Sequence, residues 1–206
     1  MISVSRKIWT QQKINKNLVE KVKQDYGFGD ILSQLIISRN YDTSEIYGVD
    51  NHQKLTNIFK DDKDYEKASL ILLNSINNNE NICILGDYDV DGACSTSLLI
   101  RYFSHINQKH FFYIPDRIAD GYGASKKLFQ KLLLKKPKLV IMVDCGSTSN
   151  EAIAYLNKHN IKSIIIDHHE INKPYPKSDA IINPKKEFIK KESSLLCATA
   201  LTYFFI

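Results

Sequence analysis

Residues 85–92 read Leu-Gly-Asp-Tyr-Asp-Val-Asp-Gly and follow directly on the apolar stretch NICIL at 81–85. Three carboxylates, Asp87, Asp89 and Asp91, therefore stand at alternate positions where a buried strand is predicted to end. Like charges this close repel one another, and at least one should take up a proton unless a cation holds them. The alternative is that these residues form a solvated acidic turn that binds no cation. A calcium-binding EF-hand loop begins similarly, but it needs a glutamate where this chain has Leu98.

The composition is that of an ordinary globular protein, with 206 residues of which 43% are hydrophobic and 25% charged. The net charge of +5 is compatible with a polyanionic substrate, although lysines on a solvated surface would give the same balance. The first twenty residues contain no apolar core of a secretory signal. The longest apolar run, LLCATALTYFFI at 195–206, is too short to span a bilayer, so we expect no membrane association.

The cysteine pattern argues against disulfides and structural zinc. Cys83, Cys94, Cys145 and Cys197 form no CxxC pair, and we expect most of them to be small core residues. The reducing cytoplasm is therefore the expected compartment.

Two parts of the chain differ in pattern. Residues 1–80 are predicted to be a helical segment, with helices over 31–39 and 64–76 and a capping box formed by Asp42 and Glu45. The polar, turn-prone run NSINNNEN at 74–81 separates this segment from a second predicted domain, residues 81–206.

Strands and helices alternate along the second part. The short apolar runs predicted as strands are 81–85, 110–114, 139–143, 162–167 and 180–183. The helices predicted between them cover 93–103, 125–134 and 150–160, the last with a capping box of Thr148 and Glu151. This alternation predicts an α/β fold with a parallel, doubly wound sheet of about five strands flanked by helices.

The chemistry-bearing residues collect at the carboxyl ends of the predicted strands, where ligands bind in such sheets. The first strand ends in GDYDVDG, the third in VDCGSTS with Asp144, and the fourth in IDHHE with Asp167, His168 and His169. Carboxylates and imidazoles without a thiolate suit Mn²⁺ or Mg²⁺. So many carboxylates predict two divalent cations, which together can activate a water molecule for attack on a phosphoryl group.

These motifs, in this order, resemble those of the DHH phosphoesterase superfamily. Trp9, the helical N-terminal segment, IPDRIADGYGAS at 114–125 and AIINPKK at 180–186 make the chain most similar to the RecJ-type single-strand-specific exonucleases. The resemblance covers essentially the whole chain. It implies metal-dependent phosphodiester hydrolysis, 5′-to-3′ on single-stranded DNA, in repair and recombination.

The resemblance also implies a role for each motif residue. Asp87 and Asp89 would hold one metal and Asp91 and His168 the other, with Asp144 bridging both. His169 would face the scissile phosphate, and Asp167 would orient the histidine pair.

It further places Arg117 and the turn Gly121-Tyr122-Gly123 along the nucleic-acid path. A surface salt bridge is an alternative role for Arg117. Tyr122 would either stack on a base or anchor its loop.

The chain departs from the family pattern in two respects. Ala198 and Ala200 stand where relatives commonly have glycines. The family also has a further metal-binding aspartate and additional domains beyond this point. Since the sequence stops on the apolar residues 203–206, we expect it to be an N-terminal fragment that associates and has little activity alone.

Two other functions stay open from the sequence. One is a related phosphodiesterase that cleaves short oligoribonucleotides or cyclic dinucleotides. The other is a non-catalytic nucleic-acid-binding fragment. Both DNA and RNA stay open as substrates. The sequence predicts neither the preferred ion nor the oligomeric state, and it predicts no protein partner.

Overall fold

The computed structural model describes residues 12–41, 62–121, 123–186 and 195–206, together with residues 6, 8, 10, 46 and 59. The chain divides into two compact units, Met1–Thr56 and Asn57–Ile206. Helix α4 (Lys63–Asn77) belongs to the second unit, although it precedes the domain division predicted at residues 80 and 81. That division remains a prediction.

The second unit is built on one parallel sheet of five strands in the order β2-β1-β3-β4-β5. The strands are β1 (Ile82–Leu85), β2 (His110–Tyr113), β3 (Leu139–Val143), β4 (Lys162–Ile166) and β5 (Ala180–Ile182). Each lies within a predicted apolar run. β1, β3 and β5 are buried along their whole length because helices cover both faces of the sheet. The predicted fold class is therefore confirmed.

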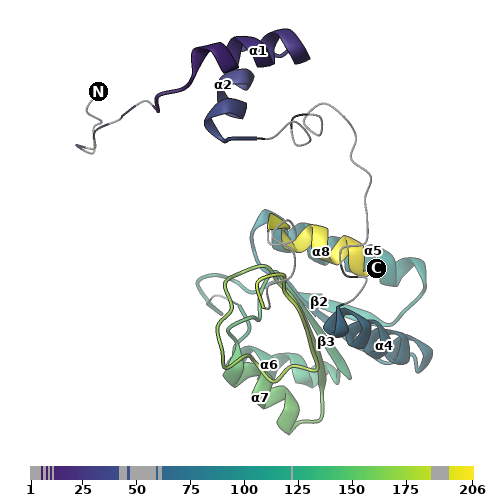
Figure 1. Ribbon diagram of the computed structural model, residues 1–206. Helices are drawn as coiled ribbons and strands as arrows, with labels where there is room; N and C mark the ends of the chain where they lie inside the picture. The colour runs from purple at the N-terminus through teal and green to yellow at the C-terminus, as the bar shows by residue number, and fades with distance from the viewer. Residues whose placement is uncertain are drawn as a thin grey trace. The chain divides into compact units, whose positions relative to one another are not determined.

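Alternate side chains of each strand enter two separate cores. Ile82, Ile84 and Ile141 pack on one face with α4, α5 (Val90–His105) and α8 (Ala198–Phe205). Cys83 and Met142 pack on the other face with α6 (Lys126–Leu132) and α7 (Asn150–Lys158). A short 3-10 turn, η1 (Leu133–Lys135), extends α6. Figure 1 shows the two layers of helices on opposite sides of the strands.

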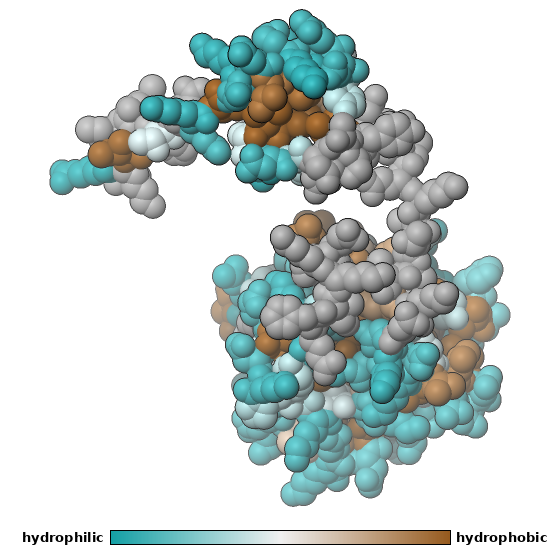
Figure 2. All heavy atoms as spheres, viewed as in Figure 1, coloured by the Kyte–Doolittle hydropathy of each residue, from teal (hydrophilic) through white to brown (hydrophobic). Residues whose placement is uncertain are grey.

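The first unit contains two helices, α1 (Lys16–Tyr26) and α2 (Asp30–Ser38). Asn15 caps the start of α1 by accepting from the backbone N–H groups of Asn17 and Leu18, and Gly27 ends it with a left-handed backbone (φ 70°). Val22 and Ile36 are buried between the helices. Figure 2 shows apolar side chains gathered in the middle of this helix pair.

Two sequence predictions are corrected here. Thr148 and Glu151 form no capping box, because the first helical hydrogen bond of α7 runs from the N–H of Ile153 to the carbonyl of Ser149, which makes Ser149 the N-cap. Of the four cysteines, all of them free, Cys94 and Cys197 are exposed and only Cys83 and Cys145 are buried.

The capping box predicted from Asp42 and Glu45 lies outside the described residues. Among the helices that are described, none is both long and apolar enough to cross a membrane.

Candidate metal centre

The first acidic motif is placed by a sharp turn between β1 and α5. A Cβ on Gly92 would lie 2.5 Å from the carbonyl oxygen of Asp87, so only glycine lets the first turn of α5 approach Asp87 this closely. Asp89 is the N-cap of α5, and its Oδ1 accepts from the N–H of Gly92 at 3.0 Å. Burial raises the pKa of Asp87, and the negative charge of Asp89 adds to the rise.

Asp144 follows β3 and is the most unusual carboxylate of the site. Its backbone is left-handed (φ 60°), and its side chain is 1% exposed. Neither of its carboxylate oxygens accepts a hydrogen bond from any residue that the structure describes. Burial, followed by the negative charges of Asp91 and Asp89, raises its pKa to about 8. A buried carboxylate without donors is costly unless a cation compensates it, so this environment fits a metal ligand.

The second buried aspartate, Asp167 after β4, has the opposite environment. It accepts from the backbone N–H groups of Ser147 (3.0 Å), His168 (2.8 Å) and His169 (3.2 Å), and from the Nδ1 of His169 at 2.7 Å. Burial alone would raise the pKa of Asp167, but the hydrogen bonds from Ser147 and His169 outweigh it and the pKa is lowered. Asp167 is therefore an ionised group that holds the His169 ring in place.

The strand ends bring the candidate ligands into two groups that share one residue. Asp87, Asp89 and Asp144 place one ligand atom each within 4.8 Å of one another, and so do Asp144, His168 and His169. The Nε2 of His168 lies 3.3 Å from Oδ1 of Asp144. Carboxylate and imidazole donors around a shared, buried carboxylate suit a pair of hard divalent cations.

Asp91 stands apart from these two groups. Its carboxylate accepts from the backbone N–H groups of Ala198 and Thr199, both at 2.8 Å, and from the hydroxyl of Thr199 at 2.5 Å. Burial acts to raise its pKa, yet these hydrogen bonds keep the pKa below its usual value. Asp91 thus caps the start of α8, and its Oδ2 is 3.6 Å from the Nε2 of His168. Its role as a ligand stays a prediction.

Three of the predicted nucleic-acid residues, Arg117, Gly121 and Gly123, lie on the loop after β2. Arg117 is exposed, with its guanidinium 5.4 Å from the ring centre of Tyr88. Gly121 and Gly123 both have a left-handed backbone, with φ of 80° and 70°. Tyr122 lies outside the described residues.

Asp120, which the sequence analysis missed, holds this loop. It accepts from the hydroxyl of Tyr113 at 2.6 Å, from the Nζ of Lys131 at 2.9 Å and from the N–H of Asp116 at 3.2 Å. These hydrogen bonds, first that from Tyr113, lower the pKa of Asp120 to about 2. Tyr113 and Lys131 stand 7 and 11 residues from Asp120 along the chain, and neither spacing is one by which a sequence predicts a side-chain contact. The sequence around Asp120 therefore does not predict its role.

A cavity of about 630 Å³ adjoins the histidine motif. Asp167 and His169 line one part of it, and Gly123 and Lys126 line another. Gly146 and the residues up to the start of α7 complete the wall. The cavity therefore extends from Gly123 to the DHH motif.

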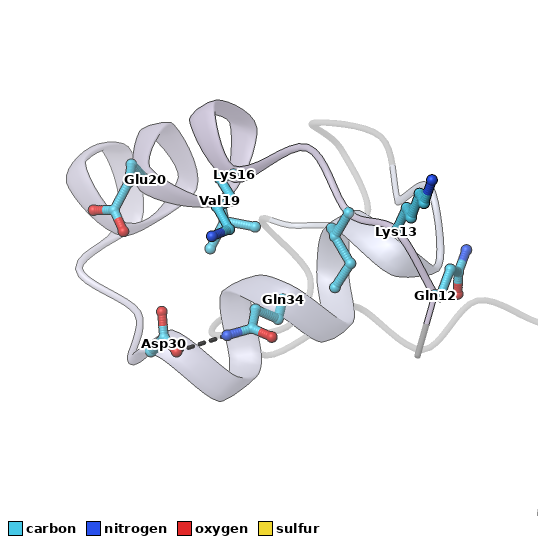
Figure 3. Close-up of a pocket in the computed structure, with 8 residues that line it drawn as sticks. Gln12, Lys13, Lys16, Val19, Glu20, Asp30 and Gln34 are labelled. Atoms are coloured by element: carbon cyan, nitrogen blue, oxygen red, sulfur yellow. Dashed lines mark hydrogen bonds between the residues drawn. The ribbon is translucent and has the colours of Figure 1, made fainter. Parts of the chain in front are cut away.

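A second pocket, of about 670 Å³, lies within the α1–α2 unit (Figure 3). Lys13, Lys16 and Glu20 line it together with Asp30 and Gln34, which are hydrogen-bonded at 2.6 Å. It contains none of the predicted site residues, and its mixture of charges is typical of a solvated helix surface.

The chain belongs to the DHH family, since the model of the DHH family N-terminal domain matches residues 81–206. Within that family it is similar to the single-stranded-DNA-specific exonuclease RecJ of Bacillus subtilis, with 28% identity over 184 residues. The alignment covers 88% of this chain but 23% of that protein, so the chain spans about a quarter of the length of this relative.

Solved structures give the same relationship. A crystal structure of exonuclease RecJ bound to manganese superimposes with a TM-score of 0.64 and 25% identity, over 69% of this chain and 36% of that one. RecJ of Thermus thermophilus in complex with Mn²⁺ matches with a TM-score of 0.69 and 19% identity, over 93% of this chain and 26% of that one. These matches confirm both the fold class and the resemblance drawn from the motifs.

Proposed function

We propose that this chain hydrolyses phosphodiester bonds with two divalent cations, Mn²⁺ or Mg²⁺, and that its substrate is single-stranded DNA. The observation that carries the proposal is Asp144, a buried carboxylate without hydrogen-bond donors among the described residues, which both groups of candidate ligands share. The name of the RecJ relatives, single-stranded-DNA-specific exonuclease, supports the substrate.

In this proposal Asp87 and Asp89 would hold one cation and His168 the other, and Asp144 would be the ligand that the two sets share. Asp91 would be a second ligand beside His168. Its carboxylate oxygens already accept hydrogen bonds from the N–H groups at the start of α8, so only their remaining lone pairs could bind the cation. When bound, two such cations neutralise the carboxylates, polarise the phosphate and supply a hydroxide nucleophile at neutral pH.

The histidine motif would act on the substrate itself. Asp167 holds the Nδ1 of His169 at 2.7 Å and so fixes the orientation of the ring. An imidazole fixed in this way would direct Nε2 toward the phosphate. Once the ring takes up a proton, its Nε2–H donates a hydrogen bond that stabilises the negative charge developing during hydrolysis, while Nδ1–H stays bonded to Asp167.

The loop after β2 would guide the strand to this centre. The exposed guanidinium of Arg117 can make a charge-assisted contact with a phosphate. It lies 5.4 Å from the ring centre of Tyr88, which is itself part of the acidic motif, so this loop is close to the metal centre. The net charge of +5 favours association with a polyanion. We further propose 5′-to-3′ polarity, a role in DNA repair and recombination, and a cytoplasmic location that suits the four free cysteines.

The test is digestion of 5′- and 3′-end-labelled DNA, single- and double-stranded, and of short oligoribonucleotides by the full-length protein with Mn²⁺. Mononucleotides released from the 5′ end of single-stranded DNA alone are the expected result. Asp144→Asn should abolish release, whereas the control Asp179→Asn changes an aspartate that binds the N–H of Ser163 at the opposite edge of the sheet and should retain it. Faster cleavage of oligoribonucleotides would assign the other phosphodiesterase activity, and binding without cleavage would assign the non-catalytic nucleic-acid-binding alternative.

A further inference from the structure

Asn183 is a buried polar residue that the proposed chemistry does not yet use. It belongs to the AIINPKK stretch at 180–186, directly after β5, and is 1% exposed. Its Nδ2 donates to the Oγ of Ser147 at 2.8 Å and to the backbone carbonyl of His169 at 3.0 Å. Its Oδ1 accepts from the N–H of Lys185 at 2.8 Å. Both amide hydrogens are therefore committed, and only an amide in this orientation satisfies all three partners.

These contacts close a ring of hydrogen bonds around the DHH motif. Ser147, which accepts from Asn183, donates its backbone N–H to Oδ2 of Asp167 at 3.0 Å. Asp167 in turn holds the Nδ1 of His169 with its Oδ1. His169 is consequently fixed at two points, its carbonyl by Asn183 and its ring by Asp167.

The ring joins the ends of three strands, since Ser147 follows β3, His169 follows β4 and Asn183 follows β5. A loop fixed at the backbone and at the side chain loses most of its freedom to move the imidazole. Groups that orient a reacting side chain in this way commonly contribute 10- to 100-fold to activity.

We propose that Asn183 is a positioning residue that sets the place of the His169 imidazole through the His169 carbonyl and Ser147. The proposal rests on the function given to His169 above, and it adds the end of β5 to the catalytic machinery. Asn183 itself contacts no substrate in this account.

The closing experiment has one arm that needs no activity. In ¹⁵N-labelled, metal-free full-length protein, imidazole ¹⁵N–¹H spectra report the tautomer of His169, which is assigned from the signal lost in His169→Ala. We expect one tautomer protonated at Nδ1 in the wild type and a shift toward the average of both tautomers in Asn183→Ala. Ser147→Ala removes the hydroxyl that Asn183 binds but keeps the backbone donor to Asp167, and it should move the same signal by less.

A matched control separates positioning from general stability. Gln108 is also a buried amide, 5% exposed, and donates to two backbone carbonyls, those of Glu80 (2.6 Å) and Lys109 (3.0 Å), at the opposite edge of the sheet. Gln108→Ala should lower stability and leave the His169 signal unchanged. An unchanged His169 signal in both Asn183→Ala and Ser147→Ala would overturn the proposal, whether or not the protein cleaves DNA.

The second arm is a double-mutant cycle on turnover. Asn183→Ala should reduce kcat about 10- to 100-fold and leave Mn²⁺ affinity within about threefold. If Asn183 acts through His169, the same substitution in a His169→Ala background should cost less than about twofold, because the group that it positions is gone. A further loss of about tenfold in that background would show that Asn183 acts independently of His169. Absence of cleavage by the wild type would instead refute the proposed function and leave the spectroscopic arm to decide this inference.

Discussion

Replacing Asp144 with asparagine should stabilise the metal-free protein at alkaline pH. The pKa of Asp144 is raised by burial from 3.8 to about 8, so the folded state keeps a proton that the unfolded chain releases near pH 4. Folding stability therefore decreases as the pH rises from about 4 to about 8 and stays at the lower level above that. Asparagine has no proton to lose, and it tolerates the left-handed backbone at this position.

The size of the effect follows from that pH window. Each pH unit contributes about 1.4 kcal/mol, so four units set an upper bound of roughly 5–6 kcal/mol. Relaxation of the buried site and the effective dielectric of a protein interior lower this bound, and we expect about 2 kcal/mol of stabilisation at pH 9 and little difference at pH 4.5. Saturating Mn²⁺ should reverse the order, because the wild type gains about 2.7 kcal/mol at a hundredfold excess over Kd and the variant loses its shared ligand.

Urea unfolding followed by far-ultraviolet circular dichroism, with EDTA or with Mn²⁺, measures these differences. Asp167→Asn is the matched control, since Asp167 is equally buried but accepts four hydrogen bonds. The same substitution there should destabilise the protein by about 2 kcal/mol at either pH. An Asp144→Asn variant that is less stable than the wild type at pH 9 in EDTA would refute the reasoning.

Three further outcomes are expected. Asp120→Asn should lower the urea midpoint at pH 7 but not at pH 2. A carboxylate with a lowered pKa stabilises the fold above its ordinary pKa, and this stabilisation is lost as the pH falls to about 2. An equal decrease of the midpoint at both pH values would contradict a role for the charge of Asp120. Asp91→Asn should cost about 1 kcal/mol of thermal stability by weakening the cap of α8, with Mn²⁺ affinity reduced less than about tenfold, and a larger calorimetric loss would assign Asp91 as a ligand. Arg117→Ala should reduce the salt dependence of single-stranded DNA binding by roughly one unit of the log–log slope, and an unchanged slope would remove Arg117 from the phosphate path.

The sequence predicts the sheet well because its strands are nearly continuous apolar runs bounded by turn residues. The run 139–143 coincides with β3, and the other four strands differ from their predicted ranges by one residue at most at either end. Such runs are characteristic of strands buried on both faces, so their meaning depends little on distant contacts.

The sequence predicts the grouping of the carboxylates and histidines but not the role of Asp91. The alternation of Asp87, Asp89 and Asp91 makes them look equivalent, as along a strand. In the structure α5 begins at Val90, three residues before its predicted start, so Asp91 lies in the first helical turn and its carboxylate points to α8. Val90 is 79% exposed, so the first residue of α5 does not belong to the buried apolar stripe by which periodicity marks a helix.

The roles of the two residues that support the DHH motif, Ser147 and Asn183, could not be predicted for a different reason. Ser147 and Asn183 are uncharged, and their contacts join positions 36 residues apart along the chain. Hydrogen bonds of this kind depend on how the strand ends are brought together, which local propensity and periodicity do not encode.

The most direct test of two cations sharing Asp144 is electron paramagnetic resonance of the full-length protein titrated with Mn²⁺. Two ions bridged by one carboxylate lie about 3.5–4 Å apart and are magnetically coupled. We expect the spectrum at two equivalents to be that of a coupled pair, and Asp144→Asn to lose the coupling. Two uncoupled Mn²⁺ signals, or a single site that Asp144→Asn leaves intact, would contradict the shared centre.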